Sequence, residues 1–156
     1  MNTLRVLLES HGIIALNKAP GVSSDEHDND KVPSMEARMR EFSEKHLLAH
    51  RIDKDTSGLL LFAESQSRII SGDSVYFWLR KNWHEAVTKH YLAIMKAPDK
   101  DIFYSDAPLY NEDKQRHQQC KTTFTVLDVN VEGLALVRAD MWMGRKHQIR
   151  KHAQET

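Results

Sequence analysis

The sequence predicts a fold of the α+β class. Short apolar or β-branched segments typical of strands are interspersed with two or three segments that carry helical spacing. The chain has 156 residues, which is the length of one domain or of a fragment of one. Hydrophobic residues make up 40% of it, which is too many for a wholly disordered chain.

The first predicted strand lies within residues 11–18, HGIIALNK, where an apolar run ends at Asn17. The turn residues APG follow at positions 19–21. Residues 24–30, SDEHDND, are polar and acidic, which is typical of a loop. We therefore expect a buried strand, a turn and a mobile surface loop, in that order.

A helix is predicted to begin at Met35, because Ser34 can serve as its N-cap. Glu36 lies in the first turn, where the helix dipole favours a negative charge. Spacings of four, three and four along one face extend this helix through Met35, Met39, Phe42 and His46.

The polar segment 50–58, HRIDKDTSG, leads directly into residues 59–64, LLLFAE, which predict a core strand. Residues 75–87 carry apolar side chains four residues apart and predict a second helix. Residues 89–95, KHYLAIM, predict another strand.

The polar segment 96–119 contains two prolines and is expected to be mostly loop. Residues 122–126, TTFTV, and 134–139, LALVRA, predict two further strands. The basic segment 144–153, GRKHQIRKHA, is expected to open a helix after Gly144.

Charge and cysteine content restrict the class of protein. Lys plus Arg and Asp plus Glu are 22 each, so a net charge of zero excludes a strongly basic nucleic-acid coat but allows a local basic groove. Cys120 is the single cysteine, which excludes an internal disulfide and a cysteine-rich zinc site. No apolar run approaches the roughly 20 residues of a membrane span, and we expect a cytoplasmic protein.

Asp53 is the first candidate for chemistry. It lies between Arg51 and Lys54, whose positive charges favour an ionised carboxylate. An ionised carboxylate at the mouth of a core strand can act as a nucleophile or a base. The alternative is a turn in which Asp and Thr side chains bond to backbone N–H groups.

Two further clusters could contact a substrate. Four of the ten residues 143–152 are Lys or Arg, which attracts phosphates, although a solvated basic helix face is the alternative. Helical spacing would place Lys146 and Arg150 on one face and Arg145 on another. In the strand 89–95, Tyr91 shares a face with Lys89 and could stack on a base, or fill the core instead.

Metal and thiol chemistry have weaker support. His46 and His50 have the spacing of two metal ligands on a helix, but the residues between them, Leu47, Leu48 and Ala49, fit no zincin pattern. Cys120 has no evident base beside it in the sequence, which indicates a structural thiol. We expect no metal.

Four segments together resemble the RluA-type family of RNA pseudouridine synthases. Segment 50–65, HRIDKDTSGLLLFAES, is similar to the catalytic segment of that family, H-R-hydrophobic-D-x-x-T-S-G. Three further segments resemble segments of that family and stand in the family's order along the chain. They are 13–22, IIALNKAPGV, 89–95, KHYLAIM, and 144–152, GRKHQIRKH. The likeness extends over nearly the whole chain, from about Gly12 to His152.

The resemblance implies a cofactor-free and metal-free isomerase that converts selected uridines of ribosomal or transfer RNA to pseudouridine. By position, Asp53 would be the catalytic aspartate, Tyr91 would stack on the uracil, and Arg150 would pair with Asp53. Arg51 would help hold the place of the flipped-out nucleotide. The other residues implied to bind substrate are His50, Thr56, Ser57, Gly58, Arg145, Lys146 and His147.

The resemblance also implies a mixed, largely antiparallel sheet flanked by helices and loops. Because the family's catalytic domain usually continues past the H-Q-I-R segment, we expect residues 1–156 to form a single catalytic domain that lacks its usual C-terminal part. We expect no N-terminal accessory RNA-binding domain. Two hypotheses follow: an active monomeric enzyme with RNA as its partner and no obligatory protein partner, or an inactive RNA-binding remnant.

Overall fold

The computed structural model describes residues 4–26, 31–68 and 72–154. It divides into two compact units, Met1–Trp83 and His84–Thr156, called here the first and second units. The predicted single catalytic domain over 1–156 stays a prediction, because two compact units can serve one catalytic function.

The first unit is built on a four-stranded antiparallel sheet in the order β1-β2-β4-β3. Its strands are β1 (Val6–Ser10), β2 (Ile13–Lys18), β3 (His46–Leu48) and β4 (Gly58–Glu64). The two central strands carry the core, where Ile14 pairs with Phe62 and Leu16 with Leu60, all fully buried. Burial of these apolar side chains stabilises the sheet, and the predicted strands within 11–18 and 59–64 are confirmed.

Strand β1 was not predicted, because its apolar residues lie on an edge strand and are largely exposed. It is joined to β2 by a two-residue turn, His11 and Gly12, which have φ of 50° and 74°. Two positive φ values are those of the turn type whose twist matches a β-hairpin. Glycine at the second turn position was the sequence signal for this hairpin.

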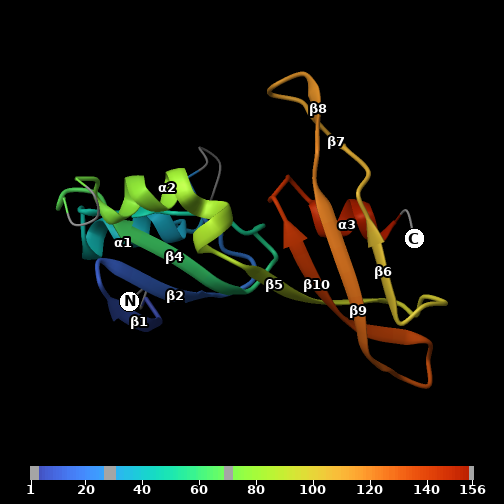
Figure 1. Cartoon of the computed structure of the whole chain (residues 1–156). Coiled ribbons are helices and arrows are strands. Elements are labelled where there is room, and N and C mark those ends of the chain that lie inside the picture. The colour runs from blue at the N-terminus through green and yellow to red at the C-terminus, as the bar shows by residue number, and fades with distance from the viewer. Residues whose placement is uncertain (1–3, 27–30, 69–71, 155–156) are drawn as a thin grey trace. The chain divides into compact units, whose positions relative to one another are not determined.

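The helices of the first unit are α1 (Met35–Phe42) and α2 (Val75–Ala86). Figure 1 shows α2 lying over β4 on one face of the sheet. Ser34 caps α1 as predicted and accepts a hydrogen bond from the Ala37 N–H at 3.1 Å. The unit boundary falls just after Asn82, where the backbone of α2 departs from helical φ and ψ.

Two predictions in this unit need correction. Helix α1 ends at Phe42 because Ser43 is extended, and His46 begins β3, so His46 and His50 do not share a helix. Ser24 is buried rather than part of a surface loop. The rest of the predicted mobile loop is Asp25 and Glu26, which are described, and residues 27–30, which lie outside the described residues.

The second unit is built on another four-stranded antiparallel sheet, in the order β5-β10-β9-β6. Its strands are β5 (Lys89–Lys96), β6 (Ile102–Ser105), β9 (Lys121–Val129) and β10 (Leu134–Trp142). A two-stranded ribbon, β7 (Leu109–Asn111) and β8 (Arg116–Gln118), extends beyond this sheet (Figure 1). The helix α3 (Gln148–Ala153) packs on the sheet through Ile149 and Ala153.

One face of this sheet forms the core of the second unit. Phe124, Ala135, Val137 and Ala139 are fully buried there, and Phe103 stacks on Phe124 with ring centroids 4.9 Å apart. The three predicted strands of this unit are confirmed. The prediction that residues 96–119 are mostly loop holds for just over half of them, and it missed the strands β6, β7 and β8.

The α+β class and the largely antiparallel sheet are confirmed, and all strand pairs in the described part of the chain are antiparallel. No helix in that part is both long enough and apolar enough to cross a membrane.

Candidate active site

Asp53 lies in the loop that connects β3 to β4 in the first unit. It is half-buried, and its carbonyl oxygen accepts a hydrogen bond from the Thr56 N–H at 3.0 Å, which closes a tight turn. The first residue of this loop is bonded to β4, the strand that follows the loop. The Ala49 N–H donates a hydrogen bond to the Leu61 carbonyl of β4 at 2.9 Å. A turn at the mouth of a buried strand can hold a carboxylate in a fixed place.

Ser24 holds the residue that precedes Asp53. Its hydroxyl donates to the Ile52 carbonyl at 2.7 Å and accepts from the Ile52 N–H at 3.1 Å. Both residues are buried. One hydroxyl therefore satisfies both backbone groups of Ile52, which would otherwise be buried without a partner in a segment that has no sheet pairing.

Lys18 holds the residue that follows Asp53. Its side chain is fully buried, and the ammonium donates to the carbonyls of Lys54 at 2.8 Å, Val22 at 2.7 Å and Ala19 at 3.1 Å. The Gly21 N–H also donates to the Lys54 carbonyl, at 2.9 Å. Three carbonyl oxygens use all three protons of the ammonium, which is the condition for burying such a group.

Electrostatics act on Lys18 in two directions. Burial lowers the pKa of its ammonium, and the carboxylates of Asp55 and Asp53 oppose that shift; the net direction is downward. Both aspartates are therefore close enough to interact with the Lys18 charge. These two carboxylates and the buried ammonium therefore form one electrostatic group.

The predicted binding residues beside Asp53 have different environments. The Nε2 atom of His50 accepts a hydrogen bond from the Leu61 N–H at 3.2 Å, and the ring lies 5.2 Å from that of Trp83. The guanidinium of Arg51 is largely exposed and pairs with Asp25, Nη1 to Oδ2, at 2.7 Å. His50 thus anchors the loop to β4, whereas Arg51 projects to the surface.

The last three predicted residues of this loop lead into β4. Thr56 is half-buried and Ser57 is exposed. Gly58 has a φ of 130°, and a Cβ atom there would meet no other atom within 4 Å. Glycine is required at this position by the backbone conformation, not by lack of space.

Tyr91 lies in the second unit, on the inward side of β5. The strand alternates strictly between half-buried and exposed residues, and Lys89 shares the inward side with Tyr91, as predicted. Tyr91 packs against the apolar core of this unit. Burial lowers the pKa of the Lys89 ammonium, and the nearby charge of Arg145 lowers it further.

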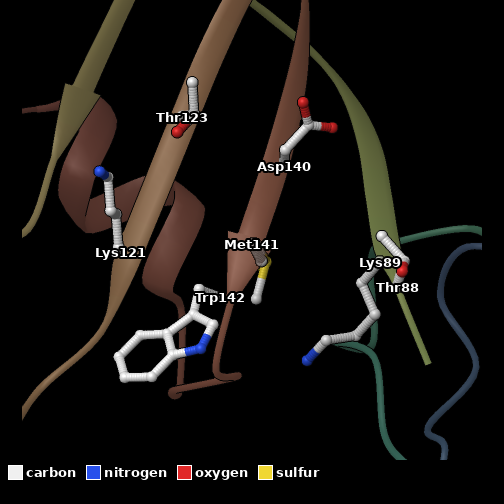
Figure 2. Close-up of a pocket in the computed structure, with 7 residues that line it drawn as sticks. All are labelled: Thr88, Lys89, Lys121, Thr123, Asp140, Met141 and Trp142. Carbon is white, nitrogen blue, oxygen red and sulfur yellow. The ribbon is translucent and has the colours of Figure 1, made fainter. Parts of the chain in front are cut away.

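A shallow pocket of about 250 Å³ lies at this end of the sheet. Figure 2 shows Thr88 and Lys89 at the start of β5, with the other residues on β9 and β10. The pocket is lined by Thr88, Lys89, Lys121, Thr123, Asp140, Met141 and Trp142. Burial raises the pKa of Asp140, but hydrogen bonds from His90 and Arg138 outweigh it and hold that pKa below its ordinary value.

The basic segment 144–152 is less helical than predicted. Helix α3 begins at Gln148, because His147 has a left-handed backbone with φ of 56°. The prediction that Lys146 and Arg150 share a helical face is therefore wrong. Arg145 is partly buried and donates from Nη2 to the Gln119 carbonyl at 3.2 Å, while Lys146 and Arg150 are exposed.

Two other residues of this segment, Gln148 and His152, are buried and join α3 to β9. The Gln148 amide donates to the Thr122 hydroxyl at 3.0 Å, and that hydroxyl lies 2.9 Å from Nδ1 of His152. The Nε2 atom of His152 lies 3.1 Å from the Ala107 carbonyl. Since a carbonyl oxygen can only accept, Nε2 carries a proton and donates to Ala107, and the Thr122 hydroxyl, which accepts from Gln148, can donate to Nδ1.

Cys120 has a histidine neighbour that the sequence did not reveal. Its Sγ lies 3.6 Å from Nε2 of His152 and 3.6 Å from the Ala107 carbonyl. Because Nε2 is protonated, His152 cannot accept the thiol proton, and both groups donate to the same carbonyl. The predicted structural thiol agrees with this geometry.

The structure thus places the predicted site residues in two groups. The first unit holds His50, Arg51, Asp53, Thr56, Ser57 and Gly58 in one loop, and the second unit holds Tyr91, Arg145, Lys146, His147 and Arg150. Sequence reasoning missed Lys18 and Ser24. Lys18 stands in the N-K-A-P-G segment but had no assigned role, and nothing in the sequence distinguished Ser24. Within the described ranges, no cluster of three or more His, Cys, Asp or Glu side chains could hold a metal ion.

Comparison with known proteins decides the family. A family model described as RNA pseudouridylate synthase matches residues 12–155. The chain belongs to this family. The predicted recognition is confirmed, and the segments that carried it all lie within the matched range.

Relatives in the RNA pseudouridylate synthase family are longer than this chain. A Mycoplasma pneumoniae protein named uncharacterized RNA pseudouridine synthase MG209 homolog is 30% identical over 166 residues, which cover 97% of this chain and 51% of the relative. Ribosomal large subunit pseudouridine synthase C of Pasteurella multocida is 28% identical, covering 96% and 48%. The chain spans about half the length of the curated relatives it matches.

Solved structures of this family share the fold. Human RNA pseudouridylate synthase domain containing 1 matches with a TM-score of 0.72 at 19% identity, covering 98% of this chain and 65% of the human chain. Human RNA pseudouridylate synthase domain containing 4 matches with a TM-score of 0.69 at 22% identity, covering 94% and 62%. At these identities the likeness establishes the fold.

Proposed function

We propose that this chain isomerises selected uridines in RNA to pseudouridine, with no metal or organic cofactor. The observation that carries the proposal is the environment of Asp53. Its half-buried carboxylate stands in the H-R-I-D-K-D-T-S-G segment, and the residues on both sides of it are fixed by buried hydrogen bonds. Membership of the RNA pseudouridylate synthase family supports the reaction class.

The proposed reaction is an isomerisation, so atoms and electrons balance within the nucleotide. The C1′–N1 bond breaks, the uracil turns, a C1′–C5 bond forms, and the proton on C5 moves to N1 through the active site. Asp53 acts either as a nucleophile at C1′ or as a base at C2′. Both roles require an ionised carboxylate held within about 3.5 Å of the reacting atom.

We propose that Tyr91 and Arg150 complete the catalytic group. An aromatic ring can stack on the uracil and place its hydroxyl near the C5 proton. A guanidinium paired with Asp53 would keep the carboxylate charged when the site excludes water. The exposed Arg150 and the half-buried Tyr91 are available for these roles in the second unit.

We propose that Arg51 and the predicted substrate-binding residues bind and deform the RNA. A target base must leave the stack before its glycosidic bond is accessible, at a cost of about a few kcal/mol. Arg51 would give up its ion pair with Asp25 and fill the space that the base leaves in the RNA stack. Phosphate contacts are assigned to Arg145, Lys146 and His147, while His50, Thr56, Ser57 and Gly58 shape the loop around the nucleotide.

Ribosomal RNA is the substrate we would test first. The family relatives named ribosomal large subunit pseudouridine synthase C act, by name, on that RNA. Transfer RNA is the second substrate class. The reaction needs only the RNA and this polypeptide, so we propose a monomer without an obligatory protein partner, located in the cytoplasm with its RNA.

The test is base-specific chemical mapping of pseudouridine in unmodified ribosomal and transfer RNA transcripts. Wild type is expected to give a primer-extension stop at a defined uridine, and Asp53→Ala is expected to give none. Asp55→Ala is the matched control, because it removes an exposed carboxylate from the same loop and should retain the stop. A folded wild type that binds RNA without product would overturn the proposal in favour of the binding-only remnant.

A further inference from the structure

Residues 18–25 contact the backbone or side chain of every residue adjacent to Asp53 in the loop. Ser24 binds both backbone groups of Ile52, and Lys18 and Gly21 bind the carbonyl of Lys54. Asp25 pairs with Arg51, one residue further out. We call residues 18–25 the clamp segment.

The clamp segment uses its most buried side chains for these contacts. Lys18 has no exposed surface, and Ser24 is 2% exposed. Burying an ammonium is unfavourable unless every proton finds an acceptor, and a hydrophobic side chain would fill the same space without that requirement. The three carbonyls that accept its protons therefore explain why a lysine stands at this position. One of them belongs to Lys54, the residue that follows Asp53.

We propose that Lys18 and Ser24 are positioning residues, which hold the backbone on either side of Asp53 so that its carboxylate meets the nucleotide in a reactive geometry. This inference rests on the proposed function, since it assigns the clamp to the same reaction. Neither residue touches the substrate. Their effect reaches the chemistry through the backbone of Ile52 and of Lys54, the residues on either side of Asp53.

The expected size of the effect follows from the geometry. Without Ser24 the Ile52 N–H and carbonyl lose the Ser24 hydroxyl, and without Lys18 the Lys54 carbonyl loses the ammonium while it keeps the Gly21 N–H. The loop would then relax toward water to satisfy these groups. A displacement of about 1 Å at a reacting group can lower a rate about 100-fold, even when binding is unchanged.

The experiment measures two properties of the full chain in parallel. The first is the single-turnover rate of pseudouridine formation at saturating enzyme, together with the Kd for the same RNA. The second is amide hydrogen exchange at Thr56, whose N–H is bonded to the Asp53 carbonyl and therefore reports the turn without any catalysis.

The variants are Ser24→Ala and Lys18→Met, with Ser34→Ala as the matched control. Ser34 is also a buried serine of the first unit that bonds one backbone N–H, but its hydroxyl contacts the start of α1. Lys18→Met is the harsher change, so Ser24→Ala keeps the test decisive if the lysine variant fails to fold.

For Ser24→Ala we expect exchange at Thr56 to rise about 10-fold and the single-turnover rate to fall about 100-fold, with Kd unchanged. Ser34→Ala should lower thermal stability similarly, with both readouts within about two-fold of wild type. Unchanged exchange, or faster exchange with an unchanged rate, would overturn the inference. An inactive wild type would refute the proposed function instead, while exchange at Thr56 would still decide whether the clamp holds Asp53.

Discussion

Two of the motif-bearing segments, residues 50–58 and 144–152, are held in place in opposite ways. In the first, the fixing groups come mainly from outside the segment, namely Lys18 and Ser24, and most of its own polar side chains stay at the surface. In the second, two residues of the segment itself, Gln148 and His152, turn inward and bond it to β9.

The difference shows that a sequence motif contains two kinds of residue, those that hold the segment in place and those that remain available to a substrate. A loop that must present a carboxylate has no ladder to satisfy its backbone, so neighbouring segments supply the partners. The six-residue helix α3 bonds only part of its backbone internally, and its buried side chains dock it on the sheet. Burial, rather than membership of a motif, separates the residues that hold the segment from those available to a substrate.

The largest effect is expected for the exposed arginine of the second segment. Arg150→Met should lower pseudouridine formation about 100-fold, because the proposed charge partner of Asp53 is lost. Stability should change by less than about 0.5 kcal/mol, because the side chain is exposed. Steady-state mapping and urea unfolding together check both parts, and a large loss of stability would place Arg150 with the docking residues.

The buried histidine of the same segment is expected to behave in the opposite way. His152→Phe removes the hydrogen bonds that His152 makes with the buried Thr122 hydroxyl and with the Ala107 carbonyl, which should lower the free energy of unfolding by about 2 kcal/mol. His117→Phe is the control, an exposed histidine of the same unit expected to change stability by less than about 0.5 kcal/mol. Equal losses of unfolding free energy in the two variants would contradict the docking role of His152.

The smallest effect concerns a histidine of the first unit outside both segments. Burial lowers the pKa of His46, and the charge of Lys45 lowers it further, against smaller opposing effects of Glu64 and Glu9. Protonation therefore favours the unfolded chain. The stabilisation is complete above the ordinary histidine pKa of 6.5 and is lost as pH falls below it toward the folded value.

Urea unfolding between pH 7.5 and 5 checks this prediction. Wild type should lose stability on acidification more steeply than His46→Gln, by less than about 1 kcal/mol over that range. Parallel pH profiles would mean that His46 titrates alike in the folded and unfolded chain.

The helices and the strands β2, β4, β5, β9 and β10 could be predicted from local patterns, because apolar spacing and capping act within a few residues. Strands β6, β7 and β8 were missed, because each is only three or four residues long within a segment that is polar as a whole. Pairing with a partner defines them: β6 pairs with β9, and β7 pairs with β8. The end of α1 was missed for a related reason. His46 fits the helical spacing, but pairing of β3 with β4 takes it into the sheet.

The sequence by itself determined the family and the α+β class, since four ordered segments and their periodicities are properties of the chain alone. It also made Asp53 the candidate catalytic residue, because charged and hydroxyl residues directly before a core strand form a local pattern. Only the tertiary structure decided that Lys18 and Ser24 fix the loop around Asp53, and that Gln148 and His152 dock a helix. Those contacts join residues 26 to 36 positions apart, and no local pattern encodes which distant carbonyl a buried side chain will meet.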